Sequence, residues 1–212
     1  MKSKTSQLLF TYWNEVRNGR LAPRRFEIEP SRITPILPET FILERLDADT
    51  YRFRLAGTRI CEDFGTELRG TNFLDGWSQD DHITLNRHLR AIAQQGGVGV
   101  VTFEAAAISG ECATFECILL PLVHTRDTVD RFLGALSRVG SVEHQQAAGR
   151  FRRHLVGTEV IWPDGKPHSV VVSQHRQVPF LPHVRNARIV RVDRRQFRVY
   201  EGGLGKSTGD DV

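Results

Sequence analysis

Cysteine is scarce in this sequence, and the few that occur form no recognisable pattern. The 212 residues contain three, Cys61, Cys112 and Cys117, with no CxxC spacing among them. An odd set without paired spacing predicts neither a disulfide framework nor a zinc site. We therefore expect the cysteines to be reduced thiols buried in the protein.

Long apolar runs and known catalytic motifs are also lacking. No apolar stretch approaches the roughly 20 residues that span a bilayer, and the apolar part of the first ten residues is too short for a secretory signal. Neither Ser109 nor Ser137 lies in a nucleophile-elbow sequence, no HExxH motif occurs, and the GKS near the end lacks the spacing of a phosphate-binding loop. The sequence therefore predicts a cytoplasmic protein that is not an enzyme.

Charge is spread unevenly along the chain. The net charge is +4, but residues 146–212 hold 12 Lys+Arg against 6 Asp+Glu, so that this segment carries +6 and residues 1–145 carry −2. A basic tail can bind nucleic acid, a nucleotide or an acidic protein, although a modest excess of Arg is also typical of a solvated surface. One hypothesis is therefore a nucleic-acid or nucleotide-binding regulator. Its candidate residues are Arg185, Arg188, Arg191, Arg194, Arg195 and Arg198.

The first predicted element is an amphipathic helix over about residues 6–18, which Asn18-Gly19 ends. Its apolar side chains recur at the spacing of one helical stripe. A stripe this aromatic must cover either its own domain or a second copy of the chain, and we predict that it forms a homodimer. The candidate dimer residues are Leu8, Leu9, Tyr12, Trp13 and Val16.

The order of the later elements predicts the fold class. Two alternating strands at 41–46 and 51–55 precede a short helix after Gly57, a long helix over Ser78 to Gln95, and three strands at 98–106, 113–123 and 131–142. This order indicates an α+β domain with a five-stranded antiparallel sheet and helices over one face. We expect an N-terminal helix (1–22), this domain (23–145), and a basic extension (146–212) with strand-like segments and a disordered end.

Several segments, taken with this order of elements, resemble a PAS domain. They are YWNEVRNGR, PRRFEIEPSRITPILPETFILE and YRFRLAGTRICEDFGTELRGTNFLDGW, and with the three later strands they cover about 135 residues. The chain looks most like a short bacterial, largely alphaproteobacterial, PAS-like family. This resemblance implies a sensory or protein-interaction module, in which the concave face of the sheet can enclose a small molecule. Such a module signals by contacting a partner protein.

The resemblance also implies which residues face the enclosed space. Most are apolar, and each of these is equally compatible with ordinary core packing. Three polar side chains, Arg59, Asn72 and His88, could orient a ligand. The full candidate set is Phe53, Leu55, Arg59, Ile60, Phe64, Asn72, Phe73, Trp77, Leu85, His88, Leu89, Phe103, Phe115 and Cys117.

The sequence does not identify a cofactor. Some PAS domains hold haem iron through a histidine of the long helix, which here carries His82 and His88, but residues six apart cannot lie on one face of a helix. Cys61 lies in RICEDF, which lacks the sequence context of a flavin photoadduct site. Haem and flavin are therefore not favoured, and both an organic ligand and no ligand remain open.

Overall fold

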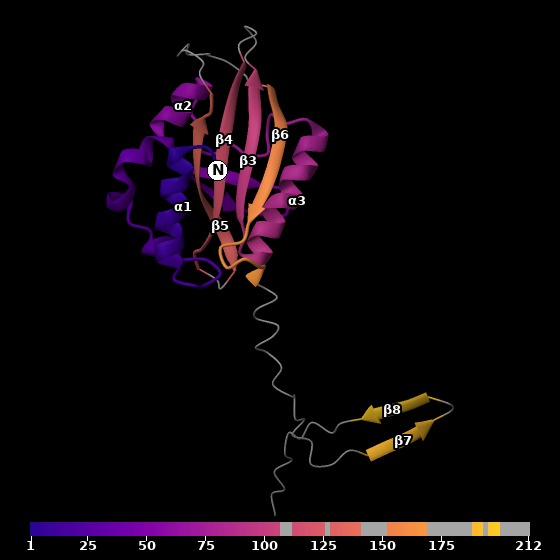
Figure 1. The fold of residues 1–212 in the computed structure, drawn as a ribbon. Coiled ribbons are helices and arrows are strands. Elements are labelled where there is room, and N and C mark those ends of the chain that lie inside the picture. Colours follow the sequence, from indigo (N-terminus) through magenta and orange to yellow (C-terminus); the bar gives the residue numbers. More distant parts are fainter. Residues whose placement is uncertain (107–111, 126–127, 141–151, 169–187, 193–194, 200–212) are drawn as a thin grey trace, which may run out of the picture. The chain divides into compact units, whose positions relative to one another are not determined.

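The computed structural model describes residues 1–106, 112–125, 128–140 and 152–168, and the backbone of 188–192 and 195–199. The chain divides into two compact units, Met1–Gln174 and His175–Val212, each described by itself (Figure 1). In the second unit, β7 (Arg188–Val192) and β8 (Arg195–Val199) pair in antiparallel fashion. The side chains of the proposed nucleic-acid site in this unit lie outside the described residues, so that hypothesis stays a prediction.

The first unit is built on a six-stranded antiparallel sheet with the order β2-β1-β5-β4-β3-β6. The five strands expected from the sequence are confirmed. The sixth comes from the C-terminal extension and pairs with β3, so the expected boundary near residue 145 does not end this unit. The strands are β1 (Thr40–Arg45), β2 (Tyr51–Ala56), β3 (Val98–Ala106), β4 (Cys112–Val123), β5 (Val129–Arg138) and β6 (Arg152–Ile161).

Helices cover both faces of this sheet (Figure 1). Helix α1 (Lys4–Arg17) contacts β4 and β5, and α3 (Gln79–Gln95) contacts β3 and β6. Between α1 and β1 lie two 3-10 helices, η1 (Arg25–Glu27) and η2 (Pro30–Glu39), and α2 (Thr58–Phe64) follows β2. Because side chains alternate along a strand, Glu116 of β4 faces α1, whereas Phe115 faces α2.

The ends of the helices follow from local sequence. The Ser78 hydroxyl accepts a hydrogen bond from the Asp81 backbone N–H and so caps α3, which ends at Gly96 with a left-handed φ of 70°. Helix α1 ends at Asn18, which takes the left-handed conformation (φ 46°). Asparagine tolerates this conformation better than most residues, so the predicted end of the first helix is confirmed.

A β-bulge in β2 changes the side of the sheet on which Leu55 lies. The register pairs Leu43 with Phe53 but Ile42 with Leu55, so Arg54 is an extra residue on β2. An extra residue inverts the alternation that follows it. Phe53 is therefore buried, whereas Leu55 is 47% exposed. The prediction that Leu55 faces the enclosed space was wrong, because simple alternation takes no account of the bulge.

The aromatic stripe of α1 packs on its own sheet. Leu9 and Trp13 have no exposed surface, and the Trp13 indole Nε1 donates a hydrogen bond to the Pro121 carbonyl oxygen at 2.9 Å. Leu8, by contrast, is 58% exposed. The stripe thus covers its own domain, and Leu9, Tyr12 and Trp13 are not available to a second copy. Homodimerisation stays a prediction that these buried residues do not support.

Glu116 ties the start of α1 to the middle of β4. Glu116 is 2% exposed, and its carboxylate accepts hydrogen bonds from the backbone N–H groups of Lys2 (2.6 Å) and Ser3 (3.0 Å). Burial alone would raise the pKa of Glu116, but these hydrogen bonds outweigh burial and hold the pKa below its ordinary value. The charged carboxylate is therefore the form that stabilises the docked helix.

We expect Glu116→Gln to lower the free energy of unfolding by about 1–2 kcal/mol at pH 7, because hydrogen bonds to charged groups contribute more than neutral ones. The folded-state pKa lies below the unfolded one, so this contribution is complete above the unfolded pKa and is lost as the pH falls through the folded pKa. Urea unfolding between pH 7 and pH 3 should show the two proteins converging. Glu104→Gln, on an exposed side chain of β3, is the matched control. A constant difference across this pH range would contradict the assignment.

Candidate functional site

A small cavity lies between the sheet and α2. Its volume is about 20 Å³, which accommodates roughly one water-sized group. Six of its ten lining residues are aromatic, and neighbouring rings meet at centroid distances such as 5.0 Å for Trp77 and Phe103 and 5.5 Å for Phe41 and Phe53. The lining residues are Phe41, Phe53, Ile60, Phe64, Leu68, Phe73, Trp77, Phe103, Leu136 and Arg153.

The structure brings together six of the residues that the sequence nominated. Phe115 lies behind the wall and stacks on Phe64 and Phe103, with centroid distances of 5.4 Å to each. Leu85, Leu89 and Cys117 have no exposed surface but belong to the surrounding core rather than to the lining. Burial raises the pKa of the Cys117 thiol, which therefore stays protonated. The six lining residues are Phe53, Ile60, Phe64, Phe73, Trp77 and Phe103.

Two of the polar candidates have structural partners away from the cavity. Arg59 is exposed on α2 and pairs with Glu39 at 3.2 Å. The Asn72 side-chain oxygen accepts hydrogen bonds from the backbone N–H groups of Tyr51 (2.9 Å) and Leu74 (3.3 Å). Asn72 thus holds the loop before α3 against β2. Neither residue lines the cavity, so the prediction that they orient a ligand there has no support from their positions.

The histidines and Cys61 do not border the cavity either. His88 is buried on α3 beside Gly99 of β3, and burial lowers the pKa of its imidazole, which favours the neutral form. The His82 Nδ1 lies 3.2 Å from the Leu74 carbonyl oxygen. Cys61 is half-buried on α2, outside the lining. Within the described part of the chain, no three His, Cys, Asp or Glu side chains come together in a group that could hold a metal ion.

The polar residue that does line the cavity is Arg153, on β6. Its guanidinium lies over the rings of Phe64 (5.0 Å to the centroid) and Trp77 (5.7 Å), and its Nη1 donates to the Asp75 carbonyl oxygen at 3.0 Å. Sequence reasoning missed this residue because charged strand residues usually face water, and because the pairing of β6 with β3 spans some 50 residues. The strand-like alternation after Arg152 was the available signal.

Two backbone N–H groups of β6 donate hydrogen bonds to the loop before α3 and to α3 itself. The Arg153 N–H donates to the Gly76 carbonyl oxygen at 3.3 Å, and the Leu155 N–H donates to the Asp81 carboxylate at 3.2 Å. Asp81 lies in the first turn of α3. The strand therefore connects the cavity wall, the edge of the sheet and the start of the long helix.

Comparison with known proteins agrees with this architecture. The PAS domain family model matches residues 1–137, from the start of the chain to the end of β5. The chain belongs to the PAS domain family. The resemblance seen in the sequence is thereby confirmed, and PAS domains are sensory modules. Strand β6 and Arg153 lie beyond the matched residues, so the PAS domain of this chain has a cavity wall completed by its own extension.

Solved structures with a similar chain path include the Rhodobacter sphaeroides LOV protein, with 15% identity, a TM-score of 0.40, and coverage of 53% of this chain and 69% of that protein. A variant of RsLOV matches with 16% identity and the same TM-score, over 52% of this chain and 65% of the other. A comparison with curated proteins returns no match. No helix among the described residues is long and apolar enough to cross a bilayer.

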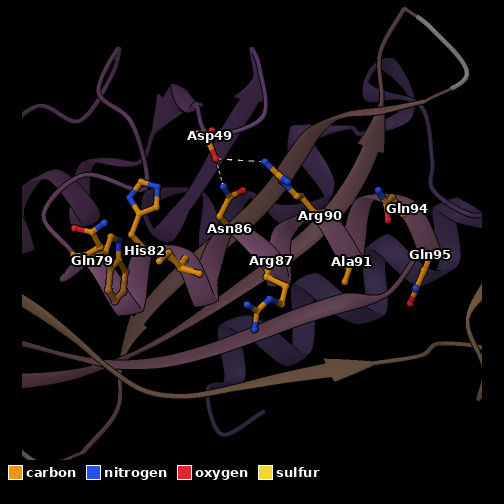
Figure 2. A pocket seen from close by; sticks show the side chains of 11 residues that line it. Asp49, Gln79, His82, Asn86, Arg87, Arg90, Ala91, Gln94 and Gln95 are labelled. Atoms are coloured by element: carbon orange, nitrogen blue, oxygen red, sulfur yellow. Dashed lines mark hydrogen bonds and ion pairs between the residues drawn. The ribbon is translucent and has the colours of Figure 1, made fainter.

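A second, open hollow runs along the outer side of α3 (Figure 2). Its volume is about 1020 Å³, and its side chains are mostly amides and guanidinium groups. Asp49, from the turn after β1, accepts a hydrogen bond from the Asn86 side chain and pairs with Arg90 at 3.4 Å. The lining residues are Asp49, Trp77, Gln79, His82, Ile83, Asn86, Arg87, Arg90, Ala91, Gln94 and Gln95.

Proposed function

We propose that this PAS domain is a cytoplasmic sensor and adaptor in which the state of the cavity controls how residues 152–168 dock, and that a partner protein reads the result. The observation that carries the proposal is the placement of Arg153. This side chain comes from beyond the PAS-matched residues and forms part of the cavity wall. A small molecule in the cavity would therefore contact the extension directly.

The same segment also reaches α1. Arg17 is 4% exposed and pairs with Asp164, whose two carboxylate oxygens lie 2.6 and 3.0 Å from the guanidinium. Hydrogen bonds from Arg17 lower the pKa of Asp164, so its carboxylate stays charged at neutral pH. Residues 152–168 thus contact the cavity through Arg153 and the helix on the other face of the sheet through Asp164. A shift of this segment would therefore change contacts both at the cavity wall and at α1.

Two arrangements of such a segment are sufficient for a sensor. A ligand shifts their populations only by its difference in affinity for the two. Strand β6 has the features of an element that can move, since it is an edge strand and most of its residues are exposed. Outside the β3 ladder, its attachment rests on the hydrogen bonds at Arg153 and Leu155, on the rings under the Arg153 guanidinium, and on contacts of His154 with Asp81 and of the Glu159 backbone with His88.

We place the partner protein on the hollow along α3. The first turn of α3 holds β6 through Asp81, so a change in β6 docking acts directly on this helix. The hollow presents Arg87 and Arg90 beside Ile83, which is 49% exposed. These side chains suit a protein surface that carries carboxylates around an apolar side chain.

Hydrogen exchange on the full chain tests the coupling between Arg153 and β6. Arg153→Met keeps an apolar side chain against Phe64 and Trp77 but removes the hydrogen bond to Asp75. A hydrogen bond from a charged donor contributes about 1.5 kcal/mol, so exchange of the backbone amides at positions 153 and 155 should rise about tenfold. Amides of the β4–β5 ladder should not change.

Arg152→Met is the matched control, because Arg152 is the neighbouring arginine on β6 and is exposed. It should leave exchange at Leu155 unchanged. If Arg153→Met also leaves β6 exchange at the original rate, the cavity wall and the strand are not coupled, and the proposed route of signalling is wrong.

A further inference from the structure

Three arginines surround a single carboxylate on the sheet. Glu44 of β1 lies opposite Arg52 of β2 and Arg131 of β5, and its carboxylate is 2.9 Å and 2.5 Å from their guanidinium nitrogens. Arg54, the extra residue of the bulge in β2, approaches the same carboxylate at 3.5 Å. The hydrogen bond from Arg52 holds the pKa of Glu44 below its ordinary value, so the carboxylate stays charged. This arginine cluster of four residues therefore carries a net charge of +2.

The cluster lies on the face of the sheet that α1 covers, but beside the helix. Arg131 and Ser137 are six residues apart on β5 and so point to the same face, and Ser137 lies opposite Glu116, which faces α1. The contacts of α1 with the sheet are mainly with β4 and β5, whereas the cluster extends over β1 and β2. The bulge places Leu55 on this face too. The Arg54 side chain is 54% exposed and Leu55 is 47% exposed, so this corner of the face is open to solvent.

One carboxylate cannot satisfy three guanidinium groups. Each guanidinium has five N–H donors, and a carboxylate offers about four acceptor positions. Within the described part of the chain, Glu44 is the one carboxylate within 4.0 Å of these three groups. The side chains of Arg52 and Arg54 are 37% and 54% exposed, so their remaining donors can reach a partner without any rearrangement of the core.

A partner cannot extend the sheet at this edge. The outer edge of β2 is already occupied by the loop that follows α2. Its Gly70 and Phe73 N–H groups donate to the carbonyl oxygens of Phe53 and Tyr51, each at 2.8 Å, and the Phe53 N–H donates to the same loop. A partner must therefore contact the side chains on the open face and not the backbone of the strand.

The charge and the exposed leucine together indicate the kind of partner. A second copy in two-fold symmetry would bring two clusters of like charge together, which is unfavourable. Nucleic acid calls for an extended basic surface, whereas residues 1–145 carry a net charge of −2. An acidic protein segment with an apolar side chain matches both the guanidinium groups and Leu55.

We propose that the open face of β1 and β2 is a docking surface for an acidic segment of a partner protein, whose carboxylates pair with Arg52 and Arg54 while an apolar side chain covers Leu55. This surface lies on the opposite face of the sheet from α3 and is separate from the hollow along that helix. The inference goes beyond the proposed function and does not depend on the coupling between Arg153 and β6.

The test titrates the full-length protein with a short synthetic peptide of Glu residues around a central Leu, against the matched Lys peptide. The readout is the NMR signals of the Arg52 and Arg54 Nε–H groups, each assigned by its loss in the Gln variant. We expect saturable shifts with the Glu peptide and none with the Lys peptide. Arg54→Gln should weaken binding about tenfold, as for the loss of one charge-assisted hydrogen bond. Leu55→Ala should weaken it about fourfold, the equivalent of one buried CH₂ group.

Two arginine variants are the matched controls. Arg152 is exposed on β6, at the opposite edge of the sheet, and Arg87 is exposed on α3. Arg152→Gln and Arg87→Gln should each bind the Glu peptide as tightly as the original protein does.

Several results would overturn the assignment. One is the absence of a saturable shift, and another is an equal response to the Lys peptide. Binding that is lost in Arg87→Gln but retained in Arg54→Gln would place the peptide on the α3 hollow. Tighter binding of a short DNA duplex at the same signals, or a dimeric mass that Arg54→Gln abolishes, would replace the acidic protein with nucleic acid or a second copy. None of these results depends on the exchange of β6 amides in Arg153→Met.

Discussion

Replacing Trp13 with alanine is expected to lower the free energy of unfolding by about 3–5 kcal/mol, the usual cost of removing a large aromatic side chain from a core. Trp13 has no exposed surface, and its indole N–H is satisfied by the Pro121 carbonyl oxygen at 2.9 Å. Alanine leaves a cavity between α1 and the sheet and leaves that carbonyl oxygen without its partner. Urea unfolding at neutral pH, followed by circular dichroism, measures the loss.

Leu8→Ala is the matched control on the same helix, because Leu8 is 58% exposed. Its effect should lie within about 0.5 kcal/mol, as for most surface substitutions. The unfolding midpoint of the original protein should also not depend on protein concentration. A concentration-dependent midpoint that Trp13→Ala abolishes would show that the stripe is buried between two copies, contrary to the packing described here.

The fold was largely predictable because its signals are local. Asn18, Gly65 and Gly96 each take a left-handed conformation directly after a helix, and Ser78 caps the longest helix. These positions mark the ends of helices from sequence alone. The alternation in β3 and β4 gave those strands to within a residue or so. The resemblance to the PAS domain then implied a five-stranded sheet with a concave face, and the family match confirms that resemblance.

The candidate site was less predictable because it depends on contacts distant in sequence. Phe64 and Trp77 could be nominated, but periodicity cannot distinguish a cavity wall from a packed core. Arg153 comes into contact with them only because β6 pairs with β3. The prediction that Leu55 faces the enclosed space was wrong for a related reason. A bulge is a property of two paired strands and cannot be read from one sequence segment.

Polar residues gave the weakest predictions. Asn72 and Arg59 lie near the nominated aromatic residues in sequence, yet each has a structural partner. Asn72 accepts a hydrogen bond from the Tyr51 backbone, and Arg59 pairs with the Glu39 carboxylate. An arginine that faces water and one that packs on aromatic rings look alike in sequence. Burial is decided by the surrounding elements, and here the half-buried Arg153 and the exposed Arg152 are adjacent on one strand. The sequence therefore identified the kind of domain and its aromatic wall, but not the group that gives the cavity its charge.

The junction between β2 and α2 should tolerate no added methyl group. A Cβ on Gly57 would lie 2.2 Å from the Pro38 carbonyl oxygen and 2.6 Å from that of Leu37, both of which are backbone atoms. The Gly57 N–H also donates to the Thr40 carbonyl oxygen at 2.8 Å, so the turn cannot move away without losing this hydrogen bond. Gly57→Ala should therefore cost about 3 kcal/mol, at the upper end of ordinary overpacking.

The effect should extend to the cavity, because α2 begins directly after Gly57 and contributes Ile60 and Phe64 to the wall. To relieve the contact, α2 must move away from η2, which displaces Phe64 from beneath the Arg153 guanidinium. We expect both a lower urea midpoint and a shifted Nε–H signal of Arg153. Gly157→Ala, where a Cβ meets nothing within 4 Å, should stabilise slightly or have no effect. If Gly57→Ala lowers the free energy of unfolding by less than about 1 kcal/mol and leaves the Arg153 signal unchanged, close packing at this junction does not determine the position of α2.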